Sequence, residues 1–386
     1  MEEARIYLDY AAATPLGRHV AAAMEPFETE LFFNPSSPYV PAIEVRQAYD
    51  EAKDSIARLI GGRSSELIMT AGATESINLA LGAVRGHVVT TAVEHQSVLA
   101  AAEQHEHTVV RVGEHGRVEP EAVKVAIRST TELVSVQLAN NEIGTLQPLR
   151  EIAAVVAEER EARRARGETR PIYLHSDASQ GLGLVDMHVA RLGVDMLTLN
   201  AAKVYGPKQV GLLWAAPHVQ LQPVVLGGGQ ERGLRSGTEN VAGVIGFAEA
   251  LRHAEKKRKN EASRLRVLRD SLQDYLSERF PDAVISGDRK HRLPNFLHIS
   301  FPSIDAERLL FALEARGVLV ATGSACAANK GTRSHVLTAI GLPPEVADGS
   351  IRISVGRGTD EMQLQRAAHH IQEVVEAEYR RTGGGG

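Results

Sequence analysis

The alternation of short apolar runs with longer stretches of helical periodicity is the feature that most constrains the fold of this chain. Six runs rich in Val, Ile and Leu follow one another: ELIMTAG, HVVTTAVEH, LVSVQLAN, PIYLHSDA, MLTLNAAK and VGLLWA. Candidate helices lie between and around them, for example residues 38–60 and 149–166. Strands that alternate with helices predict an α/β domain built on a mostly parallel sheet. The second candidate helix carries a run of charges that we interpret as a solvated face: Glu158, Glu159, Arg160, Glu161 and Arg163.

A second pattern follows this domain. A long helical stretch from residue 240 to about residue 280 leads to NFLHISFP, AERLLFALEARG and SIRISVGRG, and a last helix is expected from about residue 360 to residue 379. We therefore expect a large domain of residues 15–260 and a smaller α+β domain of residues 1–14 and 261–386.

Composition narrows the choice of partners and location. The formal net charge is −5, with both signs interspersed, which argues against DNA or an anionic membrane as partner. No apolar run approaches the roughly 20 residues that a bilayer span needs, and the N-terminal residues do not resemble a secretory signal, so we expect a cytoplasmic protein. The single cysteine excludes an internal disulfide and a cysteine-based metal knuckle, and no metal site is predicted.

Ligands of open α/β sheets bind at the carboxyl ends of the strands, so the residues after each apolar run are candidates for a site. After ELIMT, Gly72 and Ala73 allow close approach of a ligand to the backbone. Thr74 is expected to cap the next helix, whose N-terminal amides would attract a phosphate; a simple helix cap is the alternative. Neither a Walker nor a dinucleotide pattern follows any of these runs, so a nucleotide is not the obvious ligand.

Two charged residues follow neighbouring apolar runs. Asp177 ends the run PIYLHSD, and an acid in that position needs a cationic partner to offset its desolvation. Lys203 follows MLTLN, where partial desolvation can produce the nucleophilic amine that a Schiff base requires. Each could instead be a salt-bridged surface residue. Together with a phosphate site, they match the three groups that pyridoxal 5'-phosphate (PLP) requires: an anion site, a carboxylate for the pyridinium nitrogen and an amine for the aldehyde.

Ten motifs in order resemble the cysteine desulfurases of the NifS/IscS type, which belong to the class-V aminotransferase family of fold-type I PLP enzymes. They are YLDYAAATP, NPSS, GATESINLA, VEHQSVL, NNEIGTLQP, SDASQG, AKVYGPKQVGLLW, GGGQERGLRSGTEN, ATGSACAA and SIRISVGRGT, and they cover nearly the whole chain. The resemblance implies the aspartate-aminotransferase-like fold, PLP as cofactor, L-cysteine as substrate and a homodimer.

The resemblance also implies roles for single residues. Lys203 would bind PLP as a Schiff base, Asp177 would pair with the pyridine nitrogen, and His95 would stack on the ring and relay protons. Arg352 would hold the substrate carboxylate through a bidentate fork. Without the resemblance, His95 would be read as a core or surface histidine and Arg352 as part of a surface ion pair.

Further implied roles concern the cofactor's oxygen atoms. Gln180 and Asn141 would bind the phenolic oxygen or the substrate, and Thr74 and Asn200 the phosphate. Thr238 would reach the phosphate of the neighbouring subunit, which makes the site depend on a dimer. The usual motif before the lysine is Ser-x-His-Lys, whereas this chain has Asn200 and Ala202 at the two polar positions, so phosphate retention would rest more heavily on Thr74, Thr238 and helix amides.

The cysteine lies in the motif GSAC. Cys326 would attack the sulfur of the bound substrate, carry it as a persulfide and pass it to an acceptor protein for iron-sulfur cluster assembly, tRNA thiolation or a similar use, with L-alanine as the other product. An inert buried thiol is the alternative for this residue. For the whole protein the alternatives are another PLP enzyme of the same fold, such as a selenocysteine lyase or an aminotransferase, and a non-catalytic sulfur-relay scaffold.

Overall fold

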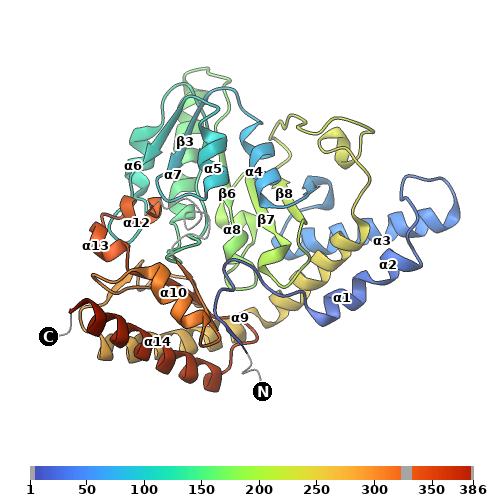
Figure 1. Ribbon diagram of the computed structural model, residues 1–386. Coiled ribbons are helices and arrows are strands. Elements are labelled where there is room, and N and C mark those ends of the chain that lie inside the picture. Colours follow the sequence, from blue (N-terminus) through green and yellow to red (C-terminus); the bar gives the residue numbers. More distant parts are fainter. Residues whose placement is uncertain (1–4, 323–332, 384–386) are drawn as a thin grey trace.

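A seven-stranded sheet forms the centre of the computed structural model, which describes residues 5–322 and 333–383 (Figure 1). Its strands lie in the order β2 (Leu67–Thr70), β8 (Gly211–Ala215), β7 (Met196–Asn200), β6 (Tyr173–Asp177), β5 (Thr131–Ser135), β3 (His87–Thr91) and β4 (His107–Val110). The pairs from β7 to β4 are parallel, and β8 runs antiparallel to both of its neighbours. The predicted α/β class with a mostly parallel sheet is confirmed.

Helices cover both faces of this sheet because its strands are apolar on both sides. In β2, Leu67 and Met69 belong to one buried cluster, which they share with α3 (Val40–Ile60) and α7 (Leu149–Ala165). Ile68 points to the other face and packs with α4 (Ala73–Leu81) and α5 (Gln96–Ala102). The remaining helices around the sheet are α1 (Arg18–Met24), α2 (Pro26–Thr29), α6 (Pro120–Ala126) and α8 (Val189–Leu192).

A smaller antiparallel sheet lies beside the large one. Its strand order is β12 (Ala321–Thr322), β13 (Ser350–Ser354), β10 (Phe296–Ser300) and β9 (Val284–Ser286). Alternate residues of β13 and β10 form a buried cluster with α10 (Ala306–Glu314) and α14 (Glu361–Thr382). The N-terminal strand β1 (Ile6–Tyr7) joins this part by parallel pairing with β11 (Val318–Leu319). Two short helices, α12 (His335–Ala339) and α13 (Pro344–Ala347), complete it.

One helix connects the two parts. α9 (Val241–Arg279) is 39 residues long; most of its buried residues up to Ala254 belong to the cluster of the large sheet, and its buried leucines from Leu265 onward belong to the cluster of the small sheet. The expected boundary at residues 260 and 261 lies between these two groups, and we keep the division into residues 15–260 and residues 1–14 with 261–386 as a proposal. Among the described residues, none of the helices has the length and apolar character needed to cross a membrane.

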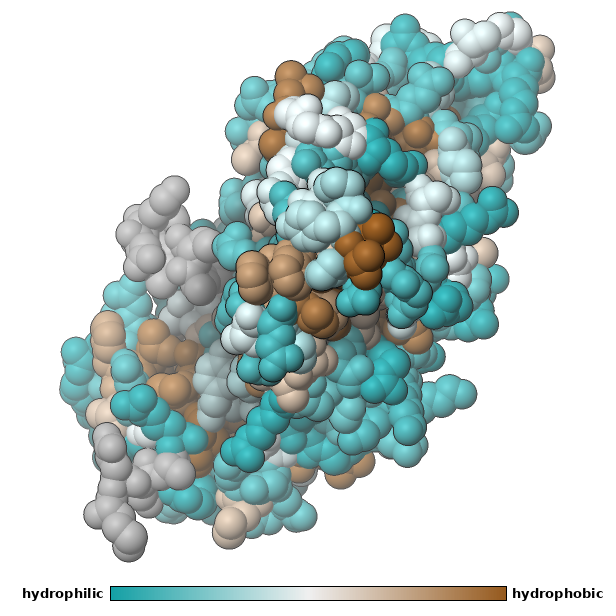
Figure 2. Space-filling model, turned by 90° about the vertical axis from the view of Figure 1, so that its right-hand side faces the viewer, coloured by the Kyte–Doolittle hydropathy of each residue, from teal (hydrophilic) through white to brown (hydrophobic). Residues whose placement is uncertain are grey.

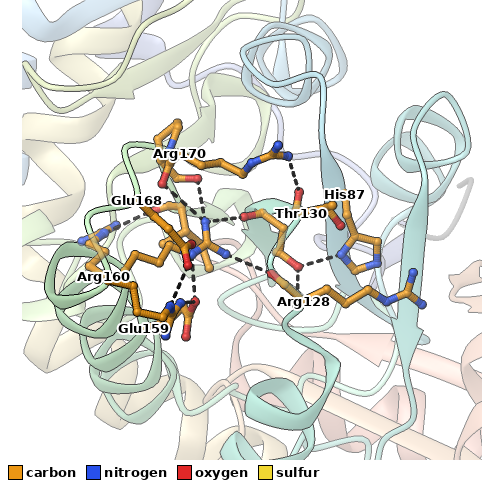
Figure 3. A network of polar contacts seen from close by, with 12 residues as sticks. His87, Arg128, Thr130, Glu159, Arg160, Glu168 and Arg170 are labelled. Atoms are coloured by element: carbon orange, nitrogen blue, oxygen red, sulfur yellow. Dashed lines mark hydrogen bonds and ion pairs between the residues drawn. The ribbon is translucent and has the colours of Figure 1, made fainter.

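A buried arginine on α7 corrects the expectation of a fully solvated charge run. The side chain of Arg163 is only 2 % exposed. Its guanidinium donates hydrogen bonds to the carbonyl oxygens of Thr131 at 2.8 Å and Arg128 at 3.0 Å, and to Glu159 Oε1 at 2.8 Å. Figure 3 shows the surrounding network, in which Arg128, Glu159 and Arg170 come from separate segments. Arg163 therefore donates hydrogen bonds to carbonyl groups at and just before the start of β5, and these bonds satisfy its own buried donors.

Replacing this arginine should destabilise the fold. Arg163→Met keeps much of the side-chain length but removes every donor, so we expect the free energy of unfolding to fall by about 2–4 kcal/mol. The matched control is Arg164→Met, because Arg164 is 69 % exposed and pairs with Glu161 at the surface; its expected cost is below about 0.5 kcal/mol. Urea unfolding of both variants measures the difference, and equal losses would contradict the assignment.

Candidate active site

Nine of the eleven residues predicted for the site line one cavity. It has a volume of about 340 Å³. The strands β3, β5, β6 and β7 all point their carboxyl ends toward it, and the loops after them supply most of its wall. The nine residues are Ala73, Thr74, His95, Asn141, Asp177, Gln180, Asn200, Lys203 and Arg352.

Lys203 stands in a short 3₁₀ turn, Ala201–Lys203, directly after β7. Asn200 caps this turn, because its Oδ1 accepts a hydrogen bond from the backbone N–H of Ala202 at 3.1 Å. The Nζ of Lys203 donates to the carbonyl oxygens of Ala11 at 2.8 Å and Ala12 at 2.7 Å. The N-terminal segment thus holds the amine at the cavity wall, a contact for which the sequence motif YLDYAAATP gave no residue-level signal.

His95 begins α5 as its N-cap residue. Its Nδ1 accepts from the backbone N–H of Ser97 at 3.1 Å and lies 2.7 Å from Ser97 Oγ. Because a backbone N–H can only donate, the neutral ring carries its proton on Nε2. His95 is exposed at the open cavity, and partial desolvation by nearby protein atoms lowers its pKa, with smaller effects of Asp177, which raises it, and of Lys203, which lowers it. His95 is therefore mostly neutral near pH 7.

Asp177 is the last residue of β6, as predicted, but a cationic side chain does not meet it. Its Oδ1 accepts hydrogen bonds from the backbone N–H of Ser179 at 3.0 Å and from Ser179 Oγ at 2.7 Å. In residues 5–322 and 333–383 no Lys, Arg or His nitrogen lies within 4.0 Å of its carboxylate, so the alternative of a salt-bridged surface residue is wrong for Asp177. Gln180 follows in the same turn, and its Nε2 donates to the Ala11 carbonyl at 3.1 Å.

The helix N-terminus expected to bind an anion is formed by α4, but Thr74 is not its cap. The N-cap residue is Gly72, with φ 135°, a conformation that favours glycine, and no side chain caps the helix. Thr74 occupies the first turn with its side chain exposed beside the cavity. The predicted capping role of Thr74 is wrong, because α4 begins at Ala73 and its N-cap is Gly72. Thr74 nevertheless lines the cavity, where its predicted contact with a ligand is possible.

Arg352 reaches the cavity from β13 of the small sheet, and its side chain is only 4 % exposed. Its Nη1 donates to the carbonyl oxygen of Asn141 at 2.8 Å, and its Nη2 donates to Asp9 Oδ1 at 2.7 Å. Arg352 does form an ion pair, with Asp9, but this pair is nearly buried and lies at the cavity. The alternative of an ion pair at the surface is therefore wrong.

Two buried acids near the cavity were missed by the sequence analysis. Glu94 accepts hydrogen bonds from Thr91 Oγ1 at 2.7 Å and from the backbone N–H of Gln137, and burial raises the pKa of Glu94 to about 8. Glu142 accepts from Ser334 Oγ at 2.5 Å, and burial raises its pKa to about 7, against the opposing effects of Ser334 and Arg352. Both lie in motifs that matched the family, VEHQSVL and NNEIGTLQP, yet nothing in those letters distinguishes a buried acid from an exposed one.

The two remaining predicted residues lie elsewhere. Thr238 is exposed and lines a separate hollow together with residues 27–35 and 239–242, not the cavity of its own chain. Cys326 lies outside the described residues. In the described part of the chain, no three His, Cys, Asp or Glu side chains are grouped so that they could hold a metal ion.

The raised pKa of Glu94 predicts a pH-dependent stability. The folded protein binds this proton more tightly than the unfolded chain does, so stability should fall as the pH rises from about 4.5 to about 8, by at most about 1.4 kcal/mol per pH unit for this group. Glu94→Gln removes that contribution and should flatten the slope. Urea unfolding between pH 5 and pH 9 tests this, with the exposed Glu103→Gln as control; a wild-type slope in the Glu94 variant would refute the prediction.

The comparisons with known proteins identify the family of the chain. The model of the aminotransferase class-V family matches residues 6–367, and the chain belongs to this family. A curated relative from Dictyoglomus turgidum, named cysteine desulfurase IscS, is 40% identical over 96% of this chain and 94% of its own length. A solved NifS-like protein has a TM-score of 0.88 at 31% identity, covering 97% of this chain and all of its own. The structure of SspA in complex with cysteine has a TM-score of 0.76 at 32% identity over 90% of this chain and 98% of that one.

Proposed function

We propose that the protein is a PLP-dependent cysteine desulfurase, which converts L-cysteine to L-alanine and transfers the sulfur to an acceptor protein. The observation that carries this proposal is the cavity itself. It brings an amine, a carboxylate, an imidazole and a guanidinium together from Lys203, Asp177, His95 and Arg352, in a chain 40% identical to a protein named cysteine desulfurase.

The residues at the cavity fit PLP. The volume of about 340 Å³ lies within the range of small-molecule sites, roughly 300–1,000 Å³. The N-terminus of α4 with Thr74 offers donors for a phosphate, and the Oδ1 of Asn200 is used by the turn, which leaves its amide N–H groups as donors. Asp177 supplies the carboxylate for a pyridinium nitrogen, and Asn141 and Gln180 supply amides. The chemistry that bound PLP provides is an electron sink for the carbon next to the substrate amine.

The other steps of the reaction are assigned to side chains of the protein. Lys203 would hold the cofactor through its amine and would take the proton from the substrate α-carbon. His95 covers the ring and can hold or release a proton at Nε2, because its lowered pKa keeps the ring neutral near pH 7. Arg352 binds the substrate carboxylate with the N–H groups that Asp9 and Asn141 do not use.

The sulfur step is assigned to Cys326. Its thiolate attacks the substrate sulfur, an S–S bond forms, and the bond from sulfur to the β-carbon breaks with its electron pair left on the carbon. Protonation of that carbon, together with return of a proton to the α-carbon, yields alanine, and the persulfide passes to an acceptor for iron-sulfur cluster assembly, tRNA thiolation or a similar use. The support is the motif GSAC, which holds the only cysteine of the sequence. We keep the cytoplasm as the proposed location.

We also propose a homodimer in which Thr238 serves the cavity of the partner subunit. Thr238 is exposed and does not meet the cavity of its own chain. Several apolar side chains are exposed in the segments around Thr238. Figure 2 shows clusters of hydrophobic residues, in brown, on the side of the molecule that carries α1, α2 and α3. Burying these side chains against a second copy would stabilise the dimer. The exposed residues are Phe32, Tyr39, Val40, Ile43, Val224, Val225 and Leu226.

The role of Lys203 as the cofactor-binding lysine is tested by the visible absorbance of the purified protein. The wild type is expected to purify with the visible absorbance of lysine-bound PLP, and Lys203→Ala should lose it. Lys208→Ala is the matched control, because the Nζ of Lys208 donates to the Thr14 carbonyl at 3.0 Å and does not line the cavity. Loss of the absorbance in the Lys208 variant with retention in the Lys203 variant would show that the assignment is wrong.

Cys326→Ser separates binding from sulfur transfer. The variant should bind PLP and respond to added cysteine with the wild-type absorbance change, because those steps use Lys203, Asp177, His95 and Arg352. Production of alanine and of reductant-released sulfide should fall to background, since a hydroxyl is a poor nucleophile toward sulfur. Wild-type sulfide release by the serine variant would remove Cys326 from the mechanism.

A further inference from the structure

One short N-terminal segment contacts both cationic side chains of the cavity. Asp9 follows β1, and its Oδ1 accepts from Arg352 Nη2 at 2.7 Å. Ala11 and Ala12, two and three residues further on, offer their carbonyl oxygens to Lys203 Nζ at 2.8 and 2.7 Å. In Figure 1 this dark-blue segment runs between α10 and α1. The segment therefore fixes the position of Arg352 relative to Lys203.

The segment is fastened at both ends. On the side of the small sheet, Asp9 forms a β-bridge with Ser354, and the backbone N–H of Ala11 donates to Ser354 Oγ at 2.9 Å. Ser354 lies two residues after Arg352 on the same strand. On the other side, Thr14 Oγ1 donates to the Ala202 carbonyl at 2.9 Å and accepts from the backbone N–H of Tyr205 at 2.7 Å. These bonds hold residues 9–14 between the strand of Arg352 and the turn of Lys203.

Asp9 also fixes the orientation of the guanidinium. Arg352 is 4 % exposed, and each of its two terminal nitrogens has one N–H bonded to the protein, Nη1 to the Asn141 carbonyl and Nη2 to Asp9. Each terminal nitrogen carries two N–H groups, so one on each is left for a carboxylate. Within the described chain, no other carboxylate lies within 4.0 Å of this guanidinium. Without Asp9 the guanidinium would lose both its counter-ion and one of its two orienting bonds.

We propose that Asp9 is a positioning residue that makes the site selective for α-amino acids carrying a free carboxylate. It orients Arg352 toward the cavity, and through the backbone of residues 9–12 it sets the spacing between the carboxylate site at Arg352 and the amine at Lys203. An α-amino acid has its carboxylate and amine on one carbon, so this spacing selects that class of substrate. The inference rests on the proposed function, because it takes Arg352 as the carboxylate site.

The test compares cysteine with cysteamine, which has the same amine and thiol but no carboxylate. Binding of each to the PLP-loaded protein is followed by the absorbance of the cofactor. Asp9→Ala should weaken binding of cysteine about ten-fold or more and leave cysteamine within about two-fold, and the KM for cysteine should rise while kcat changes little. Asp9→Asn should recover most of the cysteine affinity, because its Oδ1 still accepts from Arg352 Nη2. Asp186→Ala is the matched control, since Asp186 pairs with Arg191 and does not line the cavity.

Several outcomes would overturn the proposal. Equal weakening of cysteine and cysteamine would mean that Asp9 acts only on the general structure, and unchanged binding of both would mean that it does not position Arg352. Failure of Asp9→Asn to recover affinity, with the fold intact by thermal unfolding, would also contradict it. If the wild type binds cysteine but releases no alanine or sulfide, the proposed function fails while the binding comparison still decides the role of Asp9.

Discussion

The shared direction of four neighbouring strands is the constraint on which the rest of the site depends. β3, β5, β6 and β7 are paired in parallel, so their carboxyl ends lie at one edge of the large sheet, and each is followed by a different polar side chain. His95, Asn141, Asp177 and Lys203 are spread over more than a hundred positions of the sequence, yet the sheet places them around one cavity. The helices on both faces leave this edge as the one where backbone and side chains can meet a ligand.

The electrostatics of the cavity depend on how its charges are partnered. Lys203 is surrounded by the carbonyl dipoles of Ala11 and Ala12, and Arg352 by a carboxylate and a carbonyl. Two buried acids, Glu94 behind the wall and Glu142 in the wall itself, have raised pKa values, because burial outweighs the hydrogen bonds that they accept. The cavity is thus lined by two partnered cations, the carboxylate of Asp177 and the buried acid Glu142.

Much of this arrangement could be predicted from the sequence, because the spacing of apolar residues and the order of the motifs can be read directly along the chain. The helices expected at residues 38–60 and 149–166 are found at Val40–Ile60 and Leu149–Ala165, and the residues after the predicted strands meet at the cavity. What could not be predicted depends on backbone geometry or on distant pairing. The N-cap of α4 is Gly72 and not Thr74. Arg163 is buried and donates to a carbonyl group of another segment, and Asp9 pairs with Arg352, which lies near the other end of the sequence.

The long helix α9 has a mechanical consequence. At about 1.5 Å per residue, its 39 residues extend about 58 Å, and its two ends are embedded in different hydrophobic cores. A rotation of the small sheet against the large one would have to bend the helix between Ala254 and Leu265. Otherwise it would have to expose the buried residues at one end of the helix. The helix therefore resists such a rotation, and with it a change in the distance between Arg352 on the small sheet and the residues at the edge of the large sheet.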